Sequence, residues 1–153
     1  MIEHMLDTWE IHNRIHLYLL ESLEDENLSD VAASKGRSVG QQFAHIHNVR
    51  LMWIDAAQKE LGEGLSKLAK ETPLSKEMLA QHLIDSGQAI KELLAVGFEG
   101  GRIKGFKPHP TAFLGYLISH ESHHRGQIML ALKQSGHAAS RKIAFGMWEW
   151  GVR

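Results

Sequence analysis

The sequence predicts an all-α protein: a four-helix bundle with a short C-terminal fifth helix or strap. Four segments of about 20 residues carry apolar residues at the three- and four-residue spacing of an amphipathic helix. No segment alternates between apolar and polar residues with the period of two that a half-buried strand requires. Helices of this length on moderate loops form bundles. The 153 residues are enough for one domain with its own core, expected to span residues 1–153.

The first two helices are separated by a polar loop. The apolar stripe predicts a first helix over residues 4–23 and a second over residues 38–60, which two glycines then end. The acidic and polar run 24–37 predicts a surface loop that is long enough to lean over a pocket. Ser38 and Gln41 fit the capping-box pattern, so the second helix is expected to begin there.

The second half of the chain is predicted to contain two further long helices. Ser75 is expected to cap a third helix, and the glycines within residues 97–110 predict a flexible connection. A fourth helix is predicted over residues 111–135, with Gly136 as its stop. The tail, residues 140–150, is expected to form the fifth helix or strap. Three aromatic residues are predicted either to fasten it to the bundle or to roof a pocket: Phe145, Trp148 and Trp150.

Composition excludes several classes of function. The net charge of −1, with both signs interspersed, gives no basic footprint for nucleic acid or an acidic membrane surface. The absence of cysteine excludes disulfides, thiolate ligands and a cysteine nucleophile. No membrane span or leader segment is predicted, so a soluble cytoplasmic protein is expected. The unusual feature is eleven scattered histidines.

His120 and His124 lie four residues apart within the apolar stripe of the fourth helix. Residues at this spacing lie one above the other, so both imidazoles can face one point. A buried imidazole needs a partner, and two that converge form half of a metal site. The alternative is a pair of hydrogen-bonded core histidines.

The third ligand cannot be chosen from periodicity alone. His45 and His47 flank the apolar face of the second helix on either side, so only one can point at a given neighbour, and the other is expected at the surface or in an interface. His12 and His16 on the first helix are also four apart. They could form the site instead or line a pocket beside it, but the favoured interpretation places their polar atoms in solvent at the edge of the core.

Residues 120–124 also match the H-E-x-x-H motif of zinc proteases. In that motif the two histidines bind zinc and the glutamate, here Glu121, acts as general base. Such proteases present their substrate along a strand edge, and no strand is predicted here. The protease is therefore a distant alternative.

The sequence resembles the DinB-like superfamily of metal-binding four-helix-bundle proteins over nearly the whole chain. The matching stretches are residues 9–13, 38–53, 120–128 and 146–151, of which 120–128 is the most specific. In that family, a histidine eight residues before a tryptophan of the second helix binds metal with the two outer histidines of the H-x-x-x-H motif. The resemblance thereby selects a ligand set: His45, His120 and His124. Members often have an acidic residue where this chain has Arg50.

The resemblance implies a three-histidine site on a divalent ion, nickel or zinc first, with iron or manganese as further options. It also implies homodimers packed through helices, and relatives that transfer low-molecular-weight thiols. We therefore expect a metal-dependent enzyme, a small-molecule thiol transferase or hydrolase, in which Glu121 or a water-linked histidine carries the proton. Without cysteine in the chain, any thiol must arrive as a cosubstrate. The alternative is a non-catalytic metal-binding or stress-response protein.

Overall fold

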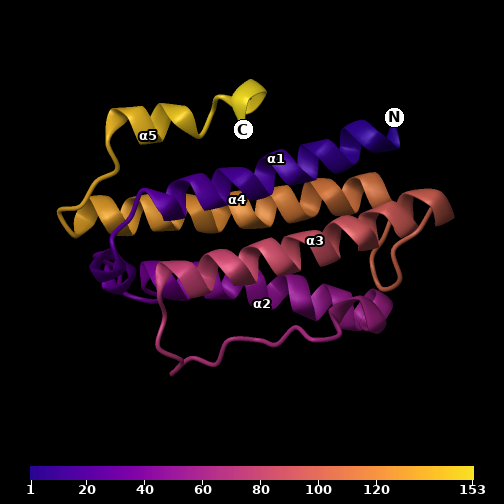
Figure 1. Ribbon diagram of the computed structural model, residues 1–153, viewed down its shortest axis with the longest axis horizontal. Helices are drawn as coiled ribbons and strands as arrows, with labels where there is room; N and C mark the ends of the chain where they lie inside the picture. Colours follow the sequence, from indigo (N-terminus) through magenta and orange to yellow (C-terminus); the bar gives the residue numbers. More distant parts are fainter.

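The computed structural model describes all 153 residues and confirms the all-α prediction: four long helices, a short C-terminal helix and no strand (Figure 1). The long helices are α1 (Ile2–Glu21), α2 (Val39–Gln58), α3 (Lys76–Gly100) and α4 (Pro110–Gln134). The short elements are η1 (Asp25–Ser29), η2 (Lys59–Gly62), α5 (Arg141–Gly146) and η3 (Trp150–Val152). No helix combines the length and the apolar character that crossing a bilayer would demand.

The four long helices form a bundle in which α1 and α2 each pack against both α3 and α4. In Figure 1, α1 runs beside α4, and α3 runs beside α2. The two N-terminal helices therefore occupy opposite corners of the bundle. A side chain directed at the centre from any of the four helices can meet the other three.

The core consists of two apolar clusters, one towards each end of the bundle. Phe43 and Leu19 belong to the first cluster, and Trp9 and Phe113 belong to the second. Buried polar side chains lie near the middle of each long helix, where one cluster gives way to the other. These residues are His12 and His16 on α1, Arg50 on α2, Ser86 on α3, and Glu121 and His124 on α4.

Capping residues place the helix starts where the sequence predicted them. The Ser38 side chain accepts a hydrogen bond from the backbone N–H of Gln41, and the Gln41 side chain returns one to Ser38, completing the capping box. Ser75 caps α3 in the same way through the N–H of Met78.

One boundary prediction was wrong. Gly97 was expected in the flexible connection, but it lies inside α3, which continues to Gly100. A Cβ at Gly97 would stand 2.2 Å from Cδ1 of Ile103, so the glycine is needed for close packing rather than for flexibility.

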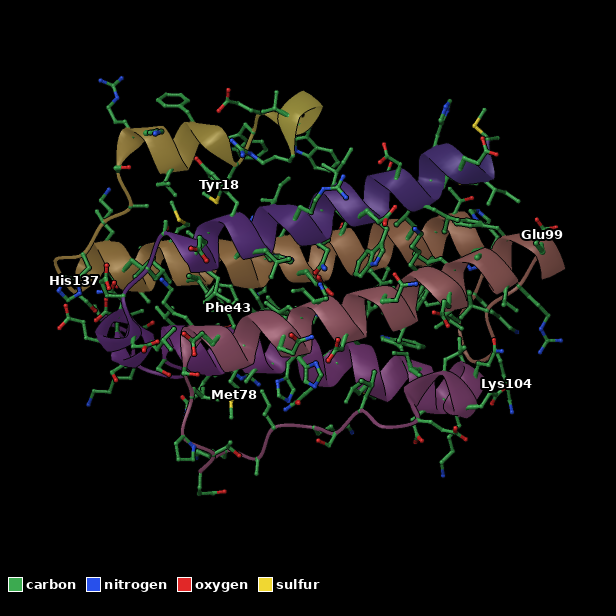
Figure 2. All side chains as sticks on the ribbon, viewed as in Figure 1. Tyr18, Phe43, Met78, Glu99, Lys104 and His137 are labelled. Atoms are coloured by element: carbon green, nitrogen blue, oxygen red, sulfur yellow. The ribbon has the colours of Figure 1, made fainter.

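The tail forms the predicted short helix, but only part of the predicted anchor holds it. Phe145 and Trp148 are 64% and 75% exposed, so neither fastens the tail. Trp150 packs against the core, and α5 approaches α1 closely because Gly146 lies against the ring of Tyr18, which lies between these helices in Figure 2.

Candidate metal centre and the buried polar layer beside it

The structure brings the three predicted ligands together. His45 extends from α2 and His120 and His124 extend from α4, and one ring nitrogen of each lies within 4.8 Å of the others. The Nε2 atoms of His120 and His124 are 3.2 Å apart. The His45 ring centroid is 4.5 Å from that of His124 and 5.5 Å from that of His120. The group could hold a metal ion.

A side-chain relay orients His124. Its Nδ1–H donates to Oε1 of Gln42 at 2.7 Å, and Nε2 of Gln42 donates to Oε1 of Gln127 at 3.0 Å. Because a neutral imidazole carries one N–H, this bond leaves the lone pair of His124 on Nε2, directed at His120. A ligating histidine commonly has its second nitrogen held by a hydrogen-bond acceptor in this manner.

The three imidazoles are neutral at neutral pH. Burial lowers the pKa of His124 to about 4, with further lowering by the charges of the neighbouring histidines. Burial also lowers the pKa of His45, followed by the positive charge of Arg37. For His120 burial again comes first, and Glu121 partly offsets it. Neutral imidazole is the form that binds metal.

The donor set fits a divalent ion. Zn–N bonds of about 2.0–2.1 Å place two nitrogens on one tetrahedral ion roughly 3.4 Å apart. The observed separations, 3.2 Å for one pair and up to 4.8 Å within the group, bracket that value. Nδ1 of His120 is buried without a hydrogen-bond partner, so nothing else fixes which of its nitrogens carries the proton.

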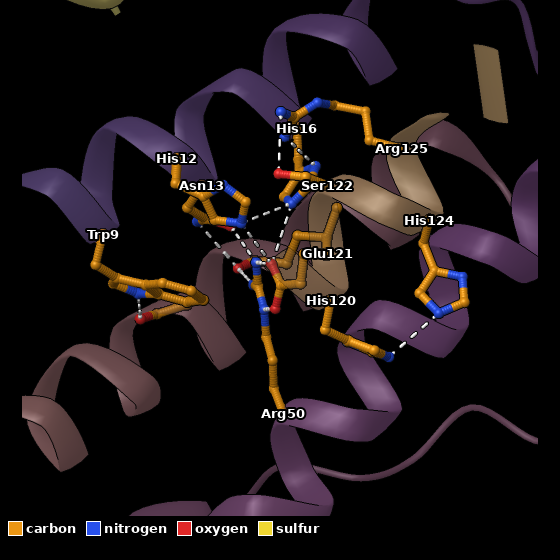
Figure 3. Close-up of polar contacts among 12 residues, drawn as sticks. Trp9, His12, Asn13, His16, Arg50, His120, Glu121, Ser122, His124 and Arg125 are labelled. Atoms are coloured by element: carbon orange, nitrogen blue, oxygen red, sulfur yellow. Dashed lines mark hydrogen bonds and ion pairs between the residues drawn. The ribbon is translucent and has the colours of Figure 1, made fainter. Parts of the chain in front are cut away.

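A second histidine group lies on the other side of α4. In Figure 3 the carboxylate of Glu121 points towards His12, His16 and Arg50, whereas His120 and His124 turn towards each other. The Nε2 atoms of His12 and His16 each lie 3.1 Å from Oε1 of Glu121 and 3.1 Å from one another. Each side chain of this group is almost completely buried.

Arg50 supplies the counter-charge for Glu121. Its Nε donates to Oε2 at 2.8 Å and its Nη2 donates to Oε1 at 2.7 Å, a two-pronged pair between α2 and α4. The same guanidinium donates to the carbonyl of Leu83 at 3.0 Å and to Oδ1 of Asn13 at 2.8 Å. One buried arginine therefore links all four long helices.

The electrostatics of this layer keep Glu121 ionised. Burial by itself would raise the pKa of the carboxyl, but the charge of Arg50 and hydrogen bonds from Arg50, His12 and His16 outweigh it and hold the pKa well below its usual range. Burial lowers the pKa of His12, and it lowers the pKa of His16 to about 3, so both rings are neutral beside the carboxylate.

The positions of the protons make this second group a poorer cation-binding site than the first. Nη1 of Arg125 lies 3.5 Å from Nδ1 of His16, and since a guanidinium only donates, Nδ1 is the acceptor and Nε2 carries the proton. That proton points at Glu121 and occupies the lone-pair position that a metal would need. Two arginines, Arg50 and Arg125, also place positive charge beside the group. Hydrogen bonding satisfies Glu121 and His16 without an ion, and Nδ1 of His12 is the nitrogen of this group that is buried without a partner.

Two sequence expectations about histidines were wrong. His47 was expected at the surface or in an interface, but it is 1% exposed, and its nitrogens face the carbonyls of His82 at 3.1 Å and Ser66 at 2.8 Å. His12 and His16 were expected to keep their polar atoms in solvent, but both side chains are fully buried. In each case the imidazole finds a protein partner that the sequence does not reveal.

Sequence reasoning missed two residues of the site, Arg50 and Gln42. Arg50 lies four residues after Ile46 and seven after Phe43, at the centre of the apolar stripe of α2. A charge at that position requires a buried partner of opposite sign, so the signal was present. Gln42 lies three residues before His45 and therefore near it on the helix, but nothing in the sequence pairs it with His124.

Comparison with known proteins shows the family of this chain. A family model described as the DinB superfamily matches residues 8–128, a span that includes both histidine groups. The chain is similar to the uncharacterized protein YrdA of Bacillus subtilis (strain 168), with 24% identity over 141 residues, or 88% of this chain and 83% of that protein. No solved structure matches it. Because the family model covers most of the chain, this protein belongs to the DinB superfamily.

Proposed function

We propose that the protein is a divalent-metal-dependent enzyme whose ion is held by His45, His120 and His124 and whose substrate is a small molecule. The observation that carries the proposal is the relay from Gln42 to His124, which turns an imidazole lone pair towards a second imidazole 3.2 Å away. The lone pair of His124 faces a nitrogen of His120 whose proton no other group fixes, so the two nitrogens can share a cation. Nickel or zinc is the ion we propose first, with iron or manganese next.

An ion on three neutral imidazoles would keep its full charge and an open position, and would activate a water molecule or a small thiol for attack. The residues of the chain have separate tasks in this proposal. The three histidines bind, Gln42 orients His124, and the half-buried His45 and His120 leave the site accessible. The reaction is transfer of a low-molecular-weight thiol or hydrolysis of a small electrophile.

We assign Glu121 a positioning role in place of proton transfer. Its carboxylate is held by Arg50 and by the two histidines of α1, on the side of α4 away from His124 (Figure 3). The protease alternative requires this carboxylate at the metal and a strand edge that binds the peptide substrate. The structure has no strand. The geometry therefore gives the protease no support.

Metal analysis of the purified protein tests the binding site. We expect about one ion per chain in the wild type and loss of that ion in His45→Ala and His120→Ala. His123→Ala is the matched control, because His123 is an exposed histidine on the same helix. Unchanged metal content in both ligand variants, with each variant folded by circular dichroism, would remove the site.

A panel of small thiols with a chromogenic electrophile, with and without chelator, tests the enzymatic part. We expect turnover with at least one thiol and its loss on chelation. If the whole panel and a matching set of ester substrates fail while chelation lowers the melting temperature, the ion has a structural role, as in a non-catalytic metal-binding protein.

A further inference from the structure

A cavity of about 650 Å³ opens beside His45, between the start of α2 and the segments on either side of it. Its polar wall includes Arg37 and Lys70, and its apolar wall includes Ala44, Leu68 and Leu74. No acidic residue lines it. The side chain of His45 is thus shared between the histidine group and this cavity.

The two cations of this cavity are unpaired. Neither Arg37 nor Lys70 makes an ion pair within 4.0 Å or a side-chain hydrogen bond, and both are exposed. Other surface cations, such as Lys59 and Lys67, also lack an ion pair, so the distinguishing feature of this cavity is that no acidic residue lines it. Two free cations on one cavity wall create a positive potential for an anion.

A second hollow of the same volume shows that this charge pattern is particular to the His45 cavity. That hollow is lined by Asp55, Glu60 and Glu63 together with Lys59 and Lys67, so its charges are mixed. It also contains no histidine. Volume alone therefore does not predict a ligand, whereas the combination of two cations, an apolar wall and His45 does.

The backbone beside each cation has a defined local conformation. Lys35 and Gly36 adopt positive φ values of 67° and 95° in the turn that leads to Arg37, the residue before the Ser38 cap of α2. Near Lys70, Asn48 holds the backbone of Leu68 with two hydrogen bonds, of 2.8 and 2.9 Å, two residues before the lysine.

We infer that this cavity binds the anionic group of a small organic acid, a carboxylate or a phosphate, through Arg37 and Lys70, with the carbon chain of the ligand against the apolar wall. A guanidinium and an ammonium are the side chains that bind such groups most strongly. The inference rests on the proposed function in one respect: His45 directs the far end of the ligand towards the metal. The substrate class of the enzyme is then a small organic anion.

The test is a titration of the full chain, followed by amide chemical shifts, with hexanoate, hexyl phosphate and hexanol as probes, in metal-free and zinc-loaded protein. We expect one or both anions to shift amides around Gly36, Ala69 and Lys70, with hexanol weaker. Arg37→Gln and Lys70→Gln should each raise the dissociation constant of the anion by about tenfold. Lys59→Gln, in the mixed-charge hollow, should have no effect. The stronger of the two anions identifies the headgroup.

Equal binding of hexanol and the anions, no binding of any probe, or unchanged affinity in both Arg37→Gln and Lys70→Gln would overturn the inference. Its failure is separable from failure of the proposed function. If zinc does not bind but metal-free protein still binds an anion through Arg37 and Lys70, only the proposed function fails. If zinc binds through the three histidines and no anion does, only the inference fails.

Discussion

The two histidine groups share a sequence pattern and differ in chemistry. Each has two histidines four residues apart on one helix and one further donor from another helix: His120, His124 and His45 in the first, and His12, His16 and Glu121 in the second. The first is partly open and contains no charge. The second is sealed and contains a carboxylate already paired with Arg50. Spacing brings nitrogens together, but the protons and charges around them determine what they can bind.

Proton placement is the sharpest part of this difference. Gln42 accepts from Nδ1 of His124 and thereby directs a lone pair inwards. Arg125 donates to Nδ1 of His16 and thereby directs a proton inwards. One neighbour prepares an imidazole to receive a cation, and the other prepares it to donate to Glu121. Substitutions that exchange or remove these neighbours test the comparison.

The largest effect is expected from Arg50→Met. It leaves Glu121 buried without its counter-charge, which typically costs about 3–5 kcal/mol of stability. Urea unfolding measures this loss. The double variant Arg50→Met/Glu121→Met removes both charges and should recover much of it. If the double variant is no more stable than Arg50→Met, the unpaired charge of Glu121 is not the cause of the lost stability.

Gln42→Ala should act on the first group alone. Without an acceptor for Nδ1, the proton of His124 can also occupy Nε2, the nitrogen that would bind the ion. Removal of such hydrogen-bond partners lowers metal affinity by about 10–100-fold. Zinc titration by calorimetry measures the affinity, with Gln88→Ala as the control because the Gln88 side chain is exposed on α3 and hydrogen-bonds Glu92. Equal affinity in the two variants would show that the relay does not prepare the site.

The second group should make the metal-free protein sensitive to acid. The unfolded chain protonates His16 below its ordinary pKa of 6.5, but the folded chain does so only near a pKa of about 3. Between these values the unfolded state binds more protons, so stability is fully present above about pH 6.5 and is lost as the pH falls, by up to about 1.4 kcal/mol per pH unit for each such group.

Urea unfolding at several pH values measures this slope, and His16→Gln should flatten it. His4→Gln, an exposed histidine on the same helix, should leave the slope as in the wild type. A slope identical in all three proteins would mean that His16 does not carry the acid sensitivity.

The smallest effect is expected from Gly126→Ala on α4. Nothing lies within 4 Å of a Cβ at this exposed position, so the substitution should stabilise the helix by up to about 1 kcal/mol. Thermal unfolding measures the gain. Because Gly126 belongs to neither group, metal affinity and the pH slope should both stay unchanged, and a change in either would show that α4 itself transmits strain between them.

Local signals in the sequence were sufficient for the fold. Ser38 and Ser75 cap the helices they were expected to cap, because a side-chain hydroxyl satisfies a free N–H within one turn. Gly97 was misplaced because a glycine in a helix and a glycine in a loop look alike until the neighbouring chain, here Ile103, is known.

The sequence by itself determined four helices, the serine caps of two of them, their apolar stripes and the inward-facing pair His120 and His124. These features depend on residues three or four apart, which can be read directly from the sequence. Only the tertiary structure decided that Arg50 meets Glu121, that Gln42 meets His124 and that His47 is enclosed by backbone carbonyls. Those partners are 71, 82 and as many as 35 residues away, and the charge or proton they contribute is set by packing between helices, which no local pattern encodes.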